Sequence, residues 1–239
     1  MFYTNAIYND GFGSQYQRII LTYIYCKLHN LQFVYRPFTA IEHNYNNYSG
    51  FIEQLETFIN LKNNIPNINN NHINNINYSD IRNYCENNID IMSNSEHLEF
   101  IKKCFWKNKC RNVFNNNKIN VAIHVRRPNI HDNRITGTDT PNSYYLNIIT
   151  AIRNKYQNNN LQFHIYSQGN FENFKTFQEN GAELHLDEDV CKTFVELVAA
   201  NILITSASSF SYCAALLSDG EIYYKKFWHN PRSHWINCE

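Results

Sequence analysis

The sequence predicts an α/β protein built on parallel sheets, and three observations lead to this prediction. Short runs of β-branched and aromatic residues alternate with longer helical patterns along the chain. Small or polar residues follow most of these runs, as they do at the carboxyl edge of a parallel sheet. The clearest case is the stretch from Lys118 to Asn129, where Val121, Ile123 and Val125 form a buried-strand pattern that ends in two arginines.

The composition indicates a folded globule that carries no broad charge. Lys and Arg total 21, as do Asp and Glu, so the formal net charge of the 239 residues is zero. Electrostatic capture of nucleic acid or anionic lipid is therefore not expected, and an anion must be met by a local cluster. Hydrophobic residues at 43% and aromatic residues at 15% are enough for a core, despite asparagine-rich patches that resemble the coding bias of an AT-rich genome, such as that of a large DNA virus or a protist.

The ends and the cysteines bear on localisation. No basic segment followed by an apolar one opens the sequence, and no run reaches the length of a membrane-spanning helix, so a cytoplasmic protein is expected. The seven cysteines form no Cys-x-x-Cys pair. Reduced thiols are therefore expected rather than a disulfide framework.

The first half of the sequence predicts a small set of strands and helices around a glycine-containing turn. Asn63–Asn77 is expected to be a loop, and Asn115–Asn117 a linker that separates domains 1–115 and 116–239. The expected elements are a strand at Phe2–Tyr8, a turn at Asn9–Gln15, a helix from Tyr16 to about His29, a strand at Gln32–Tyr35, a helical pattern at Phe51–Ile59, a short strand at Ile89–Met92, and a helix from Glu96 to about Phe114 with Ser95 as its N-cap.

The second half alternates strands and helices more regularly, as in a Rossmann-like domain. After the strand at Val121–Val125, a polar loop leads to Pro141, which is favoured at a helix start. The expected elements that follow are a helix to about Tyr156, a strand at Phe163–Tyr166, a helix at Phe171–Glu179, a strand at Glu183–Leu186, a helix at Lys192–Ala200, a strand at Ile202–Thr205, a serine-rich turn at Ser206–Ser211 opening a helix to Leu217, and a strand at Ile222–Tyr224.

Candidate binding residues gather where the strands of the second half end. His124, Arg126 and Arg127 stand at the end of one strand, and guanidinium groups match phosphate oxygens well. The turn Ser206–Ser211 offers hydroxyls and the N–H groups of a helix start, and Ser167 ends a third strand. Together these predict a diphosphate-binding site; the alternatives are surface salt bridges for the arginines and simple capping for the serines.

The turn around Gly11 and Gly13 is a weaker signal. A glycine turn between a strand and a helix lets a backbone approach a phosphate or sugar. The third glycine of a dinucleotide fingerprint is missing, so a plain strand-to-helix turn is an equal alternative.

Several of these segments together resemble a known family. The segments Ile123–Arg127, Asp10–Gln15, Thr193–Ala215, Phe163–Ser167 and Phe227–Pro231 are similar in order and spacing to motifs of the His-x-Arg-Arg superfamily of GDP-fucose-dependent fucosyltransferases. The superfamily includes the α1,2-, α1,6- and protein O-fucosyltransferases. The resemblance covers most of residues 118–239 and one loop of the first half.

The resemblance implies a GT-B-like fold, with two facing Rossmann-like domains of which the N-terminal one is reduced and holds the acceptor. It implies metal-independent, inverting transfer from a nucleotide sugar, expected to be GDP-fucose, to a glycan acceptor, with no cofactor, no metal, no nucleic-acid partner and no membrane span. By position, Arg126 matches the arginine that stabilises the leaving diphosphate. The other expected donor-binding residues are His124, Arg127, Ser167, Ser206, Ser208, Ser209, Phe210, Gly11, Gly13 and Gln15.

The sequence departs from the family pattern after the arginines and leaves other interpretations open. Asn129 stands where the family usually has an acidic residue, and the catalytic base is not evident; Asp132 is the first candidate and Asp139 the second. A UDP-sugar donor on the same fold and a catalytically inactive nucleotide- or glycan-binding module are alternatives. Asp187-Glu188-Asp189 also fits the Asp-x-Asp signature of metal-dependent glycosyltransferases. The histidines show no metal-ligand spacing, and His164 and His185 are expected to be ordinary strand or surface residues.

Overall fold

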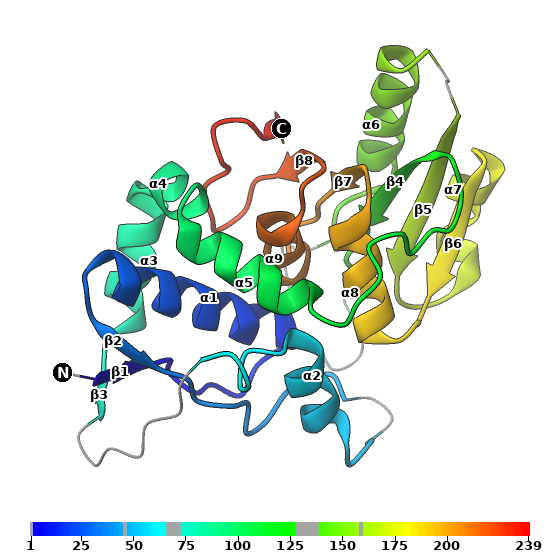
Figure 1. The fold of residues 1–239 in the computed structure, drawn as a ribbon. Helices are drawn as coiled ribbons and strands as arrows, with labels where there is room; N and C mark the ends of the chain where they lie inside the picture. Colours follow the sequence, from blue (N-terminus) through cyan, green and yellow to red (C-terminus); the bar gives the residue numbers. More distant parts are fainter. Residues whose placement is uncertain (1, 45–46, 66–72, 128–138, 158–159) are drawn as a thin grey trace. The chain divides into compact units, whose positions relative to one another are not determined.

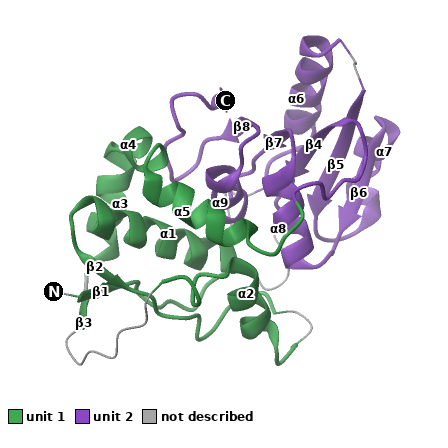
Figure 2. Cartoon of the chain, viewed as in Figure 1, with its two compact units in different colours: residues 1–110 green, residues 111–239 purple. Residues whose placement is uncertain are grey.

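The computed structural model describes residues 2–44, 47–65, 73–127, 139–157 and 160–239. These residues form two compact units, residues 1–110 and residues 111–239 (Figure 2). Each unit contains a parallel sheet flanked by helices, which confirms the predicted α/β class with a reduced N-terminal Rossmann-like part. The predicted boundary, between residues 115 and 116, falls shortly after the start of the second unit.

The first unit holds a small sheet with the strand order β2-β1-β3, all parallel (Figure 1). The long helix α1 packs against β2 and against two other helices, α3 and α5. Tyr16, Ile20 and Ile24 of this helix are completely buried. The elements are β1 (Phe2–Thr4), α1 (Phe12–Leu28), β2 (Gln32–Val34), α2 (Phe51–Ile59), β3 (Ile73–Asn75), α3 (Tyr78–Asn87), α4 (Ile89–Ser93) and α5 (Glu96–Trp106).

Several expectations for the first unit are wrong, among them the end of the first strand, which stops at Thr4 rather than at Tyr8. Ile89–Met92 belongs to helix α4 rather than to a strand, because a short apolar run fits either element and its helical neighbours decide. The segment expected to be a loop contains β3, which pairs with β1. The helix expected to begin at Tyr16 begins at Phe12, so Gly13 and Gln15 lie inside its first turn and only Gly11 precedes it.

Helix α5 confirms its predicted start but ends earlier than expected. The Ser95 hydroxyl accepts a hydrogen bond from the N–H of Leu98 at 3.3 Å, as an N-cap should. The helix stops at Trp106 instead of continuing to Phe114. Asn108 follows with a positive φ of 65°, a left-handed conformation that ends a helix.

The second unit is built on a larger sheet with the strand order β6-β5-β4-β7-β8-β9, and every pair in it is parallel (Figure 1). The elements are β4 (Ile119–His124), α6 (Asn142–Lys155), β5 (Leu161–Ser167), the 3-10 turn η1 (Phe171–Asn173), α7 (Lys175–Glu179), β6 (Ala182–Leu186), α8 (Val190–Ala199), β7 (Ile202–Ile204), α9 (Ser209–Leu217), β8 (Glu221–Lys225) and β9 (Ile236–Cys238).

Apolar residues are buried on both faces of this sheet, and one hydrophobic cluster covers the face that packs with α6 and α7. Alternate residues of the strands, among them Val121, Ile123 and Ile165, pack with apolar side chains of α6 and α7. Each such side chain, when fully buried, contributes roughly 1.5–3 kcal/mol. The intervening residues, including His124 and His164, therefore point to the opposite face.

The second unit follows the sequence prediction except at two places. The helix expected at Phe171–Glu179 is split into η1 and α7 at Phe174, a fully buried side chain. Strand β9 was not anticipated; it is only three residues long and exposed on most of its length, so its sequence carries little strand signal. No helix in the described part of the chain has the length and apolar character needed to cross a membrane.

Candidate functional site

Strand β4 carries the candidate site because it lies inside the sheet, between β5 and β7, and ends in charged residues. The Val125 N–H still donates to the carbonyl of Tyr166 at 2.9 Å, which continues the pairing with β5 by one residue. Arg126 and Arg127 are thus the first residues beyond the sheet, at its carboxyl end. In open parallel sheets ligands bind at this end.

His124, the last residue of β4, is tied to the end of the neighbouring strand β7. Its Nδ1 lies 2.8 Å from the hydroxyl oxygen of Ser206, a buried residue. Burial and, to a smaller extent, the positive charge of Arg126 lower the pKa of His124 to about 3. The imidazole is therefore neutral at physiological pH, so Arg126 supplies the positive charge at this position.

The serine-rich turn after β7 is held by its own hydrogen bonds. Ser208 is the N-cap of α9, and its hydroxyl accepts from the Phe210 N–H at 3.3 Å. The Ser208 N–H donates to the carbonyl of Ser206 at 2.8 Å, and the Ser206 N–H donates to the Ser211 hydroxyl at 3.2 Å. Ser209, the first residue of the helix, is partly exposed.

The start of α9 lies beside the end of β4 because His124 contacts both sides of the turn. The His124 ring is 5.3 Å from the Phe210 ring, centroid to centroid, in addition to its contact with Ser206. Phe210 in turn packs edge-on against Phe194 of α8 at 5.2 Å. The two strand ends are therefore in direct contact, and their joint binding of a diphosphate stays a prediction.

The guanidinium of Arg127 is engaged by residues of its own unit, while its expected donor contact stays a prediction. Nη1 donates to the carbonyl of Thr140 at 2.8 Å and lies 2.9 Å from an Asp139 carboxylate oxygen. Nη2 donates to the side chain of Asn142, the first residue of α6. The guanidinium also lies over the Phe174 ring at 5.6 Å. Arg127 therefore holds the start of α6 against the end of β4.

Sequence reasoning missed Asn142 as a supporting residue. Its side-chain oxygen accepts from Arg127, and its amide donates to the carbonyl of Asn173 at 2.7 Å. Pro141 predicts the start of the helix, but nothing in the sequence indicates that the next residue, Asn142, binds Arg127. Only the fold brings it to Arg127.

Ser167, at the end of β5, also has a structural partner. Its hydroxyl donates to the carbonyl of Val125 at 2.6 Å and so joins β5 to the residue before Arg126. Its location at the strand end is as predicted. Its hydroxyl oxygen retains the capacity to accept a hydrogen bond.

The Asp-x-Asp segment is engaged in turns rather than arranged as a cation site. Both oxygens of Asp187 accept from the Gly169 N–H, at 3.3 and 3.2 Å. Asp189 is the N-cap of α8 and accepts from the N–H groups of Cys191 and Lys192, both at 2.9 Å. These bonds favour a capping role for the two carboxylates.

The structure describes only one of the two candidate bases. Asp132 lies outside the described residues. Asp139 is described, and its ion pair with Arg127 at 2.9 Å uses the carboxylate that a base would need. Its side chain is 62% exposed, so water reaches it readily.

Hydrogen bonds from the side chain of Gln15 hold the glycine turn of the first unit in place. The Gln15 amide donates to the carbonyls of Asp10 and Ala40, at 2.9 and 2.7 Å. Gly11 lies against His43, and an added Cβ at Gly11 would be 3.0 Å from the imidazole, so a side chain here would force that ring to move. Gly13 is buried inside α1. The predicted donor contacts of Gly11, Gly13 and Gln15 stay predictions, and the contacts in the structure give Gln15 a structural role.

Comparison with solved structures gives distant similarities. The chain is similar to the Arabidopsis thaliana FUT1 mutant in complex with GDP, with a TM-score of 0.45, 11% identity, and coverage of 98% of this chain and 71% of the other. It is similar to the NodZ alpha-1,6-fucosyltransferase soaked with GDP-fucose, with a TM-score of 0.44, 9% identity, and coverage of 91% and 92%. It is similar to POFUT1 in complex with GDP, with a TM-score of 0.38, 12% identity, and coverage of 82% and 63%.

No protein-family model and no curated protein matches the chain. At identities of 12% or lower and TM-scores below 0.5, the structural similarities assign no activity to this chain. Its function has to follow from its own residues.

Proposed function

We propose that this protein is a metal-independent, inverting glycosyltransferase that transfers fucose from GDP-fucose to a glycan acceptor. In this proposal the fold is GT-B-like, residues 116–239 bind the nucleotide sugar and residues 1–115 form the acceptor side. The choice of GDP-fucose comes from the sequence resemblance of the Ile123–Arg127 and Thr193–Ala215 segments.

One observation carries the proposal: a neutral histidine joins the strand end that bears Arg126 to the start of helix α9. The contact of His124 with Ser206 and Phe210 fixes this junction. The helix start presents partial positive charge and N–H donors, and Arg126 presents a full charge. A diphosphate needs such a combination.

The chemistry follows from the charge that develops during sugar transfer. When the bond between sugar and diphosphate breaks, negative charge grows on the leaving phosphate. Arg126 stabilises that charge, and its guanidinium does so with little reorganisation when the surrounding structure already holds its backbone. Ser208 and Ser209 contact the diphosphate or the nucleotide, while Arg127, Ser167 and His124 keep the strand ends in place.

A thermal-shift experiment with nucleotides tests the donor class. The full chain is heated with GDP, GDP-fucose, UDP or a UDP-sugar, each with and without EDTA, and each compared with the same buffer lacking nucleotide. A ligand that binds only the native state raises the melting temperature; at one hundred times its dissociation constant it stabilises by about 2.7 kcal/mol. A GDP-selective shift that EDTA leaves unchanged is the expected result.

Other outcomes point to specific alternatives. A UDP-selective shift would keep the donor site and replace the sugar nucleotide. A shift that requires a divalent ion would favour the Asp187 and Asp189 interpretation. Nucleotide binding without hydrolysis or transfer of the sugar would indicate a binding module, and no shift with any nucleotide would overturn the proposal.

A further inference from the structure

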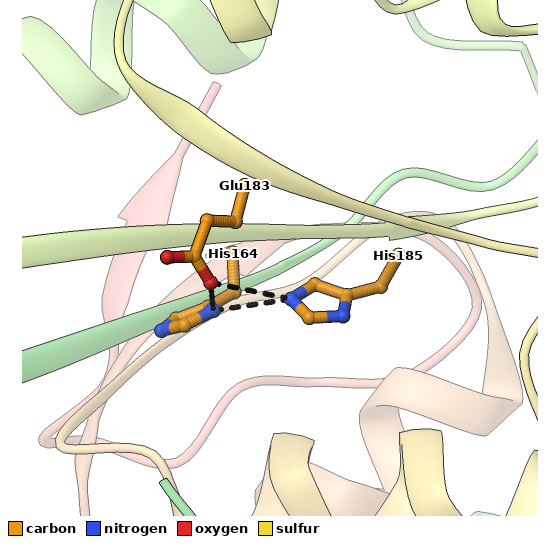
Figure 3. Close-up of side chains that lie close together, drawn as sticks. All are labelled: His164, Glu183 and His185. Atoms are coloured by element: carbon orange, nitrogen blue, oxygen red, sulfur yellow. Dashed lines mark hydrogen bonds and ion pairs between the residues drawn. The ribbon is translucent and has the colours of Figure 1, made fainter. Parts of the chain in front are cut away.

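Two histidines and a glutamate meet on the two strands at one edge of the larger sheet. In the parallel register His164 of β5 is opposite Glu183 of β6, and Tyr166 is opposite His185. Side chains alternate between faces along a strand. His164, Glu183 and His185 therefore share the face opposite the hydrophobic cluster that packs with α6 and α7. Figure 3 shows the three side chains pointing toward one another.

The ligand atoms have the spacing that a small cation requires. His164 Nδ1 lies 3.1 Å from His185 Nε2 and 3.4 Å from Glu183 Oε2, and His185 Nε2 lies 4.0 Å from that same oxygen. Zinc binds imidazole nitrogen and carboxylate oxygen at about 2.0–2.2 Å in tetrahedral sites, which places its ligand atoms about 3.3–3.6 Å apart. The observed distances bracket that range.

The hydrogen bond between His164 and Asn120 determines which ring nitrogen of His164 carries the proton and which carries the lone pair. Nε2 lies 3.1 Å from Oδ1 of Asn120. The orientation of the Asn120 amide is settled because its Nδ2 donates to Asn116 Oδ1 at 3.0 Å and to the Lys118 carbonyl at 3.1 Å. Nε2 of His164 must therefore donate, and Nδ1 is the acceptor in the neutral ring.

His185 is fixed in the same way by a carboxylate. Its Nδ1 lies 3.0 Å from Glu188 Oε1, and the other Glu188 oxygen accepts from Lys192 Nζ at 2.6 Å. Because a carboxylate oxygen only accepts hydrogen bonds, Nδ1 of His185 donates to Glu188, and in the neutral ring Nε2 carries the lone pair.

The two inward-facing nitrogens lie 3.1 Å apart, so either a proton on one of them or a cation bound by both can join the two rings. A carboxylate that orients a ligating histidine is the usual outer partner in zinc sites. Glu188 stands in that relation to His185.

We propose that His164 Nδ1, His185 Nε2 and a Glu183 carboxylate oxygen bind a transition-metal ion of the zinc class, with water completing the coordination. Two imidazoles and one carboxylate suit zinc, copper or nickel, whereas calcium and magnesium take oxygen ligands. The ion joins the edge strand β6 to β5. This site does not depend on the proposed sugar transfer, since none of its ligands belongs to the Arg126 region.

A neighbouring group of possible ligands, His185, Glu188 and Glu196, fits a cation less well. The Lys192 ammonium already lies 2.6 Å from Glu188 and 4.0 Å from Glu196. Its positive charge takes the place that a metal ion would need. The cluster of His164, Glu183 and His185 is therefore the site to test.

The test measures metal binding directly on the full chain. Protein treated with chelator and then freed of it is titrated with zinc chloride by calorimetry, and with cobalt(II) by absorption spectroscopy. We expect saturable binding of one zinc ion and a cobalt spectrum of tetrahedral type without the charge-transfer band of a thiolate ligand. Because Cys110 is exposed and Cys191 and Cys238 are partly exposed, that band would reveal binding at cysteine instead.

Two variants and a matched control locate the ion. Glu183→Gln keeps the size of a side chain that is 60% exposed, so this variant should fold, and it removes one ligand. His185→Gln removes a second ligand, and Glu179→Gln removes an exposed carboxylate elsewhere in this unit. Binding should weaken at least tenfold in the first two variants and stay unchanged in the control; even loss of an outer partner usually costs 10–100-fold.

The result that overturns the proposal is equally defined. Absence of saturable zinc binding by the wild-type chain would mean that a proton alone bridges the two histidines. Binding that Glu183→Gln leaves unchanged, or a cobalt spectrum with thiolate ligation, would place the ion elsewhere. If His185→Gln fails to fold, the comparison of Glu183→Gln with Glu179→Gln decides.

Discussion

Nδ1 of His124 and Oγ of Ser206 lie 2.8 Å apart, and this contact joins two strand ends that are 82 positions apart in the sequence. Because the imidazole is neutral, it can exchange a hydrogen bond with the hydroxyl without adding charge. The contact therefore sets the position of the serine-rich turn relative to the arginines.

Replacing Arg126 should remove most of the proposed turnover. Arg126→Ala deletes the guanidinium that stabilises the leaving diphosphate, and loss of one such donor typically lowers kcat by about 10²–10³-fold. Initial rates of sugar transfer from GDP-fucose measure this effect. Arg111→Ala is the matched control, because Arg111 lies in the same unit and is 60% exposed in a surface ion pair with Asp219. Near-wild-type rates for Arg126→Ala would disprove its role.

Replacing Arg127 should mainly reduce stability. Arg127→Met removes the bonds to Thr140 and Asn142 and the ion pair with Asp139, while the side chain is only 15% exposed. Because the carbonyl of the buried Thr140 then loses its donor, we expect the free energy of unfolding to fall by about 1–3 kcal/mol. Urea unfolding followed by circular dichroism measures it. Arg111→Met should change the free energy of unfolding by less than about 1 kcal/mol. An equal loss in both variants would show that Arg127 does not hold the start of α6 against the end of β4.

His124 should contribute to acid sensitivity. Its pKa is about 3 in the folded protein against 6.5 ordinarily, so between these values the unfolded chain binds more protons than the folded one. The free energy of unfolding must therefore fall as the pH drops from 6.5 toward about 3. His124→Gln cannot titrate, and its unfolding free energy should decline less steeply over this range. If the unfolding free energy of His124→Gln fell with pH as steeply as that of the wild type, His124 would not be kept neutral in the folded protein.

The two serines at the start of α9 should separate capping from ligand binding. Ser208→Ala removes the side-chain acceptor of the Phe210 N–H, which should cost about 1 kcal/mol of stability. Ser209→Ala removes a partly exposed hydroxyl in the first turn, so it should leave stability within about 0.5 kcal/mol and weaken GDP binding. Urea unfolding and calorimetry with GDP distinguish the two. Equal stability losses would contradict the assignment of Ser208 as the cap.

Asp187 offers a test of metal dependence in the proposed reaction. Asp187 has a positive φ of 55°, a conformation that asparagine also tolerates, and an amide oxygen can still accept from the Gly169 N–H. Asp187→Asn should therefore fold normally and keep its rate of transfer, with or without EDTA. A large loss of activity that added manganese restores would instead support the metal-dependent interpretation of the Asp-x-Asp segment.

Much of the fold could be predicted from the sequence, because local patterns carry strands and helices. The apolar run at Val121–Val125 and the serine-opened helix α9 are read correctly from their own residues. Ile89–Met92 was wrongly expected to be a strand, since these four residues fit a strand or a helix turn equally well. Strand β3, in an asparagine-rich stretch, exists because β1 offers a pairing edge.

The sequence singles out the residues of the candidate site, whose ligand contacts stay predictions, but not the contacts among these residues. Small and charged residues at strand ends are visible in the sequence, whereas the order of strands is not. That Ser206 reaches His124 depends on β7 pairing with β4, and that Arg127 turns toward Asn142 depends on where α6 begins. The His164, Glu183 and His185 cluster depends entirely on the register of β5 and β6.

The neighbours of β4 also bear on how the chain folds. β5 is the strand that follows β4 in the sequence. β7 comes later, after α7, β6 and α8, so pairing of β7 with β4 closes a long loop. Non-local parallel pairings form slowly. During refolding, the sheet edge with β5 and β6 can thus assemble before the serine turn reaches His124, and the capacity to hold an anion should return later than most secondary structure.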